Sequence, residues 1–259
     1  MTDRSESAAA GVVSRTIVVF GATSAIAGAC MRRWAKPGVR IVIVARSSDR
    51  ASSVRGDLIA RGADVPPPVV ADLTAVDSLE DVVERAWAAA AQPPDLILIA
   101  HGTLPSQVRV ESDSVYAAAS WAANATSPLL LALLLARRIE SASHGALVVI
   151  TSVAGDRGRR SNALYGAAKA SLNVFLDGLR PRLAASGGWV MTVRPGFVDS
   201  PMTGDLKKSP LFASPEHVAL SIDRGIERHR SVIYTPALWR VLMTTLKLVP
   251  ERLFWRLPI

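Results

Sequence analysis

Seven short apolar runs alternate with longer amphipathic stretches along this chain, and this alternation constrains the fold more than any other feature. The runs are TIVVF (16–20), RIVIVA (40–45), PVVAD (68–72), DLILIA (95–100), ALVVIT (146–151), WVMTVRP (189–195) and SVIYTP (231–236). Continuous apolar strands are typical of a parallel sheet that helices cover on both faces. The alternation therefore predicts an α/β fold, a doubly wound parallel sheet of about seven strands.

Helices are expected between these strands, at about 25–36, 76–91, 114–140, 163–185 and 215–229. No linker-like composition interrupts the middle of the chain, so residues 15–236 are expected to form one domain. A loose tail, 1–14, precedes it and lacks the pattern of a secretory signal. An extension, 237–259, follows it. The longest apolar run, 128–136, is about half of what a bilayer crossing needs, so a buried helix is expected there.

Composition and charge narrow the class of protein. Apolar residues make up 49% of the chain, which suits a globular protein with a sizeable core. The single cysteine excludes an intramolecular disulfide and favours a reducing compartment, so a cytoplasmic protein is expected. The net charge of +8 favours either anionic partners or a solvated basic surface. No nucleic-acid partner is expected, because the basic residues cluster with apolar ones instead of forming an exposed stripe.

Chemically interesting residues follow the strands, at the sheet edge where α/β proteins bind ligands. The segment YGAAK places Tyr165 and Lys169 four residues apart, on one face of a helix. An ammonium beside a phenol favours the phenolate, so a lowered pKa is expected for Tyr165, which would suit it to proton transfer. Ser152 comes directly after the strand 146–151, and Asn124 lies inside a long helical stretch, where Asn is unfavourable.

Taken in this order and spacing, Asn124, Ser152, Tyr165 and Lys169 resemble the short-chain dehydrogenase/reductase family. The opening turn GATSAIA and the turn RPGFVDSPM add to a resemblance that covers about residues 15–236. It implies a Rossmann-like fold in which Tyr165 protonates a carbonyl oxygen while a nicotinamide cofactor delivers hydride to its carbon. Ser152 would orient that oxygen. Lys169 would lower the pKa of Tyr165 and bind the nicotinamide ribose, and Asn124 would hold a water of a proton relay.

The same resemblance implies a cofactor site with some departures from the family pattern. The opening turn keeps Gly21 but has Ala25 and Ala27 at the other two glycine places, and IAHG (99–102) replaces the family's Asn-Asn-Ala-Gly. Ala45 stands at the end of the second strand where an acid would select NAD, and Arg46 follows it, so NADP(H) is favoured over NAD(H) unless Arg46 points to solvent. The expected cofactor-binding residues are Gly21, Thr23, Ser24, Ala25, Ile26, Arg46, Asp72, Leu73, His101, Gly102, Tyr165, Lys169, Pro195, Gly196, Val198 and Ser200. No metal is expected, since the remaining histidines lack ligand spacing.

Two further segments bear on the substrate. Arg157, Arg159 and Arg160 lie between Ser152 and Tyr165, where they suit a phosphate or form a solvated basic loop. The extension 237–259 mixes apolar, aromatic and basic residues, so it either lies at a membrane surface or packs on the domain or on a second subunit. Together with the ending LPI, these segments resemble the reductases of polyprenyl-phosphate-linked 2-keto-pentofuranose. This implies a lipid-linked keto-sugar substrate, an arabinofuranosyl lipid product for the cell envelope, and a flavin-dependent oxidase as pathway partner.

Two other functions remain open on the sequence. One is a soluble reductase of 3-oxoacyl thioesters or steroid-like alcohols, and the other is an NADP-binding sensor or scaffold without turnover. The family also implies a homodimer or homotetramer, formed through the long helices with apolar residues such as Leu129, Leu133 and Phe175. A cytoplasmic location, with or without a peripheral contact to the inner face of the plasma membrane, agrees with all of these.

Overall fold

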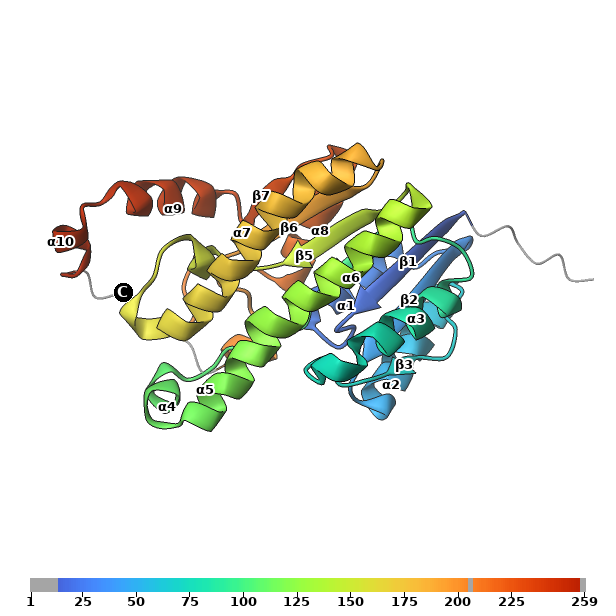
Figure 1. The fold of residues 1–259 in the computed structure, drawn as a ribbon, viewed down its shortest axis with the longest axis horizontal. Helices are drawn as coiled ribbons and strands as arrows, with labels where there is room; N and C mark the ends of the chain where they lie inside the picture. Colours follow the sequence, from blue (N-terminus) through green and yellow to red (C-terminus); the bar gives the residue numbers. More distant parts are fainter. Residues whose placement is uncertain (1–13, 205–206, 257–259) are drawn as a thin grey trace, which may run out of the picture.

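The computed structural model describes residues 14–204 and 207–256 (Figure 1), so nearly all of the expected tail 1–14 and the LPI ending lie outside it. The predicted architecture is confirmed. Seven parallel strands form one sheet in the order β3-β2-β1-β4-β5-β6-β7. The strands are β1 (Arg15–Phe20), β2 (Val39–Ala45), β3 (Val69–Val70), β4 (Leu96–Ile99), β5 (Ala146–Ile150), β6 (Trp189–Pro195) and β7 (Val232–Thr235).

Helices cover both faces of the sheet, and the alternation of side chains along each strand explains the continuous apolar runs. In β1, Ile17 and Val19 belong to one core cluster, whereas Val18 and Phe20 belong to the other. The first cluster includes α1 (Ala25–Trp34), α2 (Ser48–Ala60) and α8 (Pro215–Glu227). The second includes α3 (Leu79–Ala90), α6 (Ser127–Ala142) and α7 (Ala163–Ala185), and Figure 1 shows α6 and α7 running across the sheet on one side.

Some elements differ from the expected boundaries. The strand expected at 68–72 is reduced to Val69–Val70, because it lies at the sheet edge and Pro68 cannot donate a ladder hydrogen bond. The helix expected at 114–140 is divided into α5 (Ser114–Trp121), a π-helical turn (Ala122–Thr126) and α6. A short helix, α4 (Gln107–Ser112), precedes it in a stretch that had no assigned element.

One continuous helical stretch in the described part of the chain, Ser114–Ala142, is long and apolar enough to cross a membrane. Its most apolar window of 18 residues has a mean hydropathy of 1.4, and half of that window is buried within the fold. Leu131, Leu135 and Ile139 of α6 are fully or almost fully buried against the sheet, as expected for the run 128–136. By length and composition alone the segment is weak evidence for a membrane span, since core helices of this kind share the property.

The C-terminal extension forms α9 (Leu238–Leu248) and α10 (Glu251–Phe254), which extend beyond the end of the sheet in Figure 1. Trp239 and Met243 of α9 are buried in a small cluster with Val153, so one face of this helix packs on the domain. The opposite face leaves Leu238 60% and Val241 66% exposed. The extension therefore packs on the domain through one face, and its outer face mixes exposed apolar residues with exposed polar and basic ones such as Arg240 and Thr244.

Candidate active site

A cleft of about 600 Å³ runs along the carboxyl ends of the strands. It brings together every residue expected to act in catalysis or cofactor binding, and of the three arginines of the 157–160 loop it includes Arg159 alone. The residues come from six strand ends and from α1, α7 and the π-helical turn, as expected for the ligand-binding edge of a parallel sheet.

The opening turn between β1 and α1 forms one end of the cleft. Gly21 has φ +81°, and a Cβ there would lie 2.6 Å from the His101 backbone nitrogen, so only glycine fits. Ser24 precedes α1 without a side-chain hydrogen bond to the helix, so the first N–H groups of α1 remain open to an anion. Ala25 lines the cleft, whereas Ala27 is fully buried in the core, where its methyl group is accommodated.

Two arginines line this end of the cleft, although the sequence pointed to one. Arg46 is exposed just after β2. Arg50, in the first turn of α2, donates from Nη2 to the Thr23 carbonyl oxygen at 3.3 Å. Because Arg46 precedes α2, helical spacing does not connect the two arginines, and no sequence pattern indicated Arg50. Asp72, close by, accepts hydrogen bonds from the backbone and side chain of Thr74, which lower its pKa.

His101 is a neutral imidazole in this cleft. Ser127 donates its hydroxyl proton to the Leu73 carbonyl oxygen at 2.5 Å, so its oxygen accepts from His101 Nε2 at 2.9 Å. This arrangement fixes the proton on Nε2 and leaves Nδ1 as a buried acceptor, without a partner among the described residues. Burial and the nearby Lys169 ammonium lower the pKa of His101 to about 3.

Tyr165 and Lys169 share one face of α7, but the pKa of Tyr165 differs from the expected direction. Burial raises the pKa of Tyr165, and this effect outweighs the opposing hydrogen bond with Ser152 and the charge of Arg159. Lys169 lies with Nζ 5.6 Å from the centre of the Tyr165 ring, and burial lowers its own pKa to about 8. The expected lowering of the Tyr165 pKa is therefore wrong for this structure, because desolvation of the phenol outweighs the contacts that favour its charged form.

Asn124 and Ser152 are fixed by the backbone around them. Asn124 Nδ2 donates to the Ser120 carbonyl oxygen at 2.9 Å and to Thr103 Oγ1 at 3.1 Å, and its Oδ1 accepts from the Thr103 backbone at 3.0 Å. These contacts supply hydrogen-bond partners for both polar atoms of the buried Asn124 side chain, which is why an Asn is tolerated inside this helical stretch. The Ser152 hydroxyl accepts from the Ala154 backbone at 3.1 Å, at the start of a short 3-10 turn (Val153–Asp156).

Comparison with known proteins agrees with this geometry, since residues 15–210 match the profile of the family described as short chain dehydrogenase. The chain belongs to this family. Being a short-chain dehydrogenase, it is an NAD(P)-dependent oxidoreductase. An uncharacterized oxidoreductase of Streptomyces coelicolor is 35% identical to this dehydrogenase, over 95% of this chain and 96% of that protein. One of Mycobacterium tuberculosis is 33% identical over 93% and 96%.

A solved structure of a relative shows the same fold. The short-chain dehydrogenase from Sphingobium yanoikuyae in complex with NADPH has a TM-score of 0.78 and 25% identity, over 92% of this chain and 97% of that one. The curated relatives named above are uncharacterized, so the narrower resemblance to keto-sugar reductases stays a prediction.

The three arginines of the 157–160 loop of this short-chain dehydrogenase have different surroundings. Arg157 does not face the cleft, because its Nη1 donates to the carbonyl oxygens of Leu246 and Val249, the latter at 2.8 Å, and its guanidinium lies 3.8 Å from the centre of the Phe254 ring. Carbonyl groups at a helix end lack partners within the helix, which explains this contact. Arg160 is exposed and lies in a second groove beside the cleft. All three arginines therefore line this second groove, and Arg159 alone also lines the cleft.

Proposed function

We propose that this dehydrogenase reduces a ketone to a secondary alcohol with NADPH. The observation that carries the proposal is the convergence of Ser152, Tyr165 and Lys169 at one end of a single cleft whose other end contains Arg46 and Arg50. The hydroxyl, phenol and ammonium groups of the first three residues suit proton transfer to a carbonyl oxygen, and the two guanidinium groups suit an anionic nucleotide.

The residues present suggest how reduction proceeds. Bound NADPH would supply the hydride to the carbonyl carbon. Because burial raises the pKa of Tyr165, its hydroxyl keeps the proton at neutral pH and can donate it to the carbonyl oxygen. The Ser152 hydroxyl holds that oxygen, and the Lys169 ammonium stabilises the phenolate that proton donation leaves on Tyr165. The neutral phenol favours the reductive direction.

The proposed cofactor is NADP(H) over NAD(H). The second strand ends without an acid, and Arg46 and Arg50 line the cleft where a 2′-phosphate would lie. The open N-terminus of α1 suits the pyrophosphate, and Nδ1 of His101 offers an acceptor for a hydroxyl group of the cofactor. The complex of the Sphingobium yanoikuyae relative with NADPH supports this choice.

The proposed substrate is a polyprenyl-phosphate-linked 2-keto-pentofuranose, reduced to the arabinofuranosyl lipid. Arg159 supports this, because it lines both the cleft and the second groove, and its buried Nε has no partner among the described residues. An anionic group beside the ketone would satisfy it. The second groove continues between α4 and α10 along Phe254 and Trp255, whose apolar rings suit a lipid chain.

This substrate sets the expected context of the enzyme. It implies a flavin-dependent oxidase that supplies the ketone, a cytoplasmic location, and a peripheral contact of α9 and α10 with the inner face of the plasma membrane. The exposed Leu238, Val241 and Trp255 on this extension support such a contact. A homodimer or homotetramer through the long helices completes the proposal.

The decisive experiment follows NADPH oxidation with two ketones, a synthetic polyprenyl-phosphate 2-keto-pentose and acetoacetyl thioester, and identifies the products. We expect reduction of the keto-sugar, and Tyr165→Phe should lower the rate by about a thousandfold or more while NADPH still binds. Preferred turnover of the thioester would replace the keto-sugar by the soluble-reductase alternative. NADPH binding without turnover of either ketone would favour the sensor alternative, and full activity of Tyr165→Phe would remove the catalytic assignment.

A further inference from the structure

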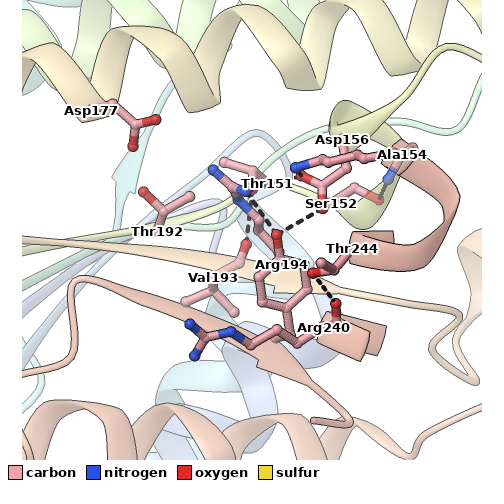
Figure 2. A network of polar contacts seen from close by, with 12 residues as sticks. Thr151, Ser152, Ala154, Asp156, Asp177, Thr192, Val193, Arg194, Arg240 and Thr244 are labelled. Atoms are coloured by element: carbon pink, nitrogen blue, oxygen red, sulfur yellow. Dashed lines mark hydrogen bonds and ion pairs between the residues drawn. The ribbon is translucent and has the colours of Figure 1, made fainter. Parts of the chain in front are cut away.

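A buried carboxylate lies four residues after Ser152 and outside the reacting groups. The Asp156 side chain is 1% exposed and accepts from Arg194 Nη1 at 2.9 Å and from the Tyr234 hydroxyl at 2.7 Å. Lys247 Nζ, on α9, lies 3.6 Å from the same carboxylate. Figure 2 shows Asp156 and Arg194 beside Ser152. A single carboxylate therefore joins β6, β7 and the C-terminal extension to the turn that follows Ser152.

The turn between Ser152 and Asp156 is short and tightly held, so its two ends cannot move independently. The Gly155 backbone N–H donates to the Ser152 carbonyl oxygen at 3.2 Å, and the Ser152 hydroxyl accepts from Ala154. The backbone of Gly155 also packs against α7, where an added Cβ would lie 2.6 Å from the carbonyl carbon of Lys169. A shift of Asp156 would therefore change the position of Ser152 relative to Tyr165 and Lys169.

The extension reinforces the same turn from the other side. Arg157, the next residue, donates to two carbonyl groups at the end of α9, and Trp239 of α9 packs on Val153 within the turn. Lys247 approaches Asp156 from the last turn of α9. Both termini of the Ser152–Asp156 turn thus contact elements that come later in the chain.

We propose that Asp156 is a positioning residue, whose contacts with Arg194, Tyr234 and Lys247 fix the Ser152 hydroxyl at the distance from Tyr165 that carbonyl reduction requires. It touches neither the ketone nor the cofactor and acts through Ser152. Loss of its charge leaves Arg194 buried without its ionic partner, which loosens the turn. The kinetic part of this inference rests on the proposed reduction, whereas its structural part does not.

The kinetic test compares Asp156→Asn with Asp177→Asn, a control that removes a charge from an exposed pair with Arg180 on α7. With the ketone that the wild-type enzyme reduces, Asp156→Asn should lower kcat by about tenfold or more and leave the NADPH Kd within about twofold. The double variant with Ser152→Ala should be no slower than Ser152→Ala alone, because Asp156 acts through Ser152. If the losses of kcat in the two single variants added in the double variant, the proposal would be overturned, because a role of Asp156 in general stability would lower kcat independently of Ser152.

A second measurement needs no turnover. Amide hydrogen exchange, followed by NMR, should speed up by about tenfold or more at Ala154 and Gly155 in Asp156→Asn, and not in Asp177→Asn. Tyr234→Phe keeps the ion pair between Asp156 and Arg194 and removes the two hydrogen bonds that the Tyr234 hydroxyl makes with these residues. It should give a smaller increase, and it serves as the test if Asp156→Asn does not fold. Unchanged exchange at these amides would refute the positioning role. A lack of ketone reduction in the wild-type enzyme, with faster exchange in Asp156→Asn, would refute the proposed function alone.

Discussion

At the scale of single residues, burial sets the chemistry of the Tyr165–Lys169 pair. Both side chains lie at the inner end of the cleft, and burial moves their pKa values in opposite directions, up for the phenol and down for the ammonium. Tyr165 therefore keeps its proton across neutral pH. Lys169, with a pKa of about 8, is the group whose charge changes near physiological conditions.

The rate of ketone reduction should therefore fall as the pH rises through about 8, where Lys169 loses the positive charge that stabilises the Tyr165 phenolate. The measurement is kcat/KM for reduction between about pH 6 and 10, a range that includes the titration of Lys169. Lys169→Arg keeps its charge throughout, so its activity, although lower, should show no decline near pH 8. A wild-type profile that stays flat to the alkaline limit would contradict this assignment.

Individual side chains also determine the proposed preference for NADPH over NADH. Replacing both Arg46 and Arg50 by Ala should weaken NADPH binding by about tenfold or more and leave NADH binding within about twofold, because only NADPH carries the 2′-phosphate. Binding is followed by quenching of protein fluorescence. Arg61→Ala, which removes an exposed guanidinium paired with Asp57 on α2, is the control. Equal loss of affinity for both cofactors would show that these arginines do not distinguish them.

At the scale of elements, the turn after β6 depends on its contact with α9. Gly196 has no room for a side chain, since a Cβ would lie 1.9 Å from Trp239 Nε1. Gly196→Ala should therefore lower the free energy of unfolding by about 1–3 kcal/mol and weaken NADPH binding. Chemical denaturation measures the first effect. Gly178→Ala, where the Cβ would meet nothing within 4 Å, should be neutral or stabilising.

A second variant separates the cause from general damage to the fold. Adding Trp239→Val to Gly196→Ala makes room for the new methyl group and should recover part of the NADPH affinity, although the smaller side chain costs core packing. Affinity that is no better in the double variant would mean that the contact between these residues does not set the geometry of the turn.

Elements with a local pattern could be predicted from the sequence, and contacts between distant residues could not. The apolar runs gave the strands, and the spacing of Tyr165 and Lys169 on one helix placed the catalytic pair in the cleft. The bond between Tyr234 and Asp156 joins residues 78 positions apart, and no periodicity signals it. Desolvation of Tyr165 likewise depends on the whole assembled cleft, so the direction of its pKa shift was mispredicted.

At the scale of the molecule, an apolar surface on the long helices suits a second copy of this chain. Val174 on α7 is 72% exposed and Val115 on α5 is 79% exposed, while α5 and α7 contact one another. Val115, Val174 and the half-buried Phe175 therefore expose apolar side chains to water on two neighbouring helices. Burial within the fold accounts for half of the most apolar window of Ser114–Ala142.

The expected assembly in solution is therefore a dimer or tetramer, and Val174→Glu should dissociate it by placing a charge in the apolar interface. Light scattering coupled to size-exclusion chromatography gives the mass of both proteins. Val241→Glu, at a similarly exposed valine on the outer face of α9, should leave the mass unchanged. A monomeric wild-type protein, or an assembly that tolerates Val174→Glu, would exclude this interface.

The contact between Gly196 and Trp239 has a consequence for how the enzyme is made in the cell. The turn that begins at Gly196 lines the cleft, but its neighbour Trp239 belongs to α9, which follows the last strand of the sheet. During synthesis, all seven strands of the sheet are made before α9. The turn at Gly196, however, takes the shape seen here only when α9 packs against it. A polypeptide that stopped before α9 would therefore carry every strand of the sheet and still lack the contact that shapes this side of the cleft.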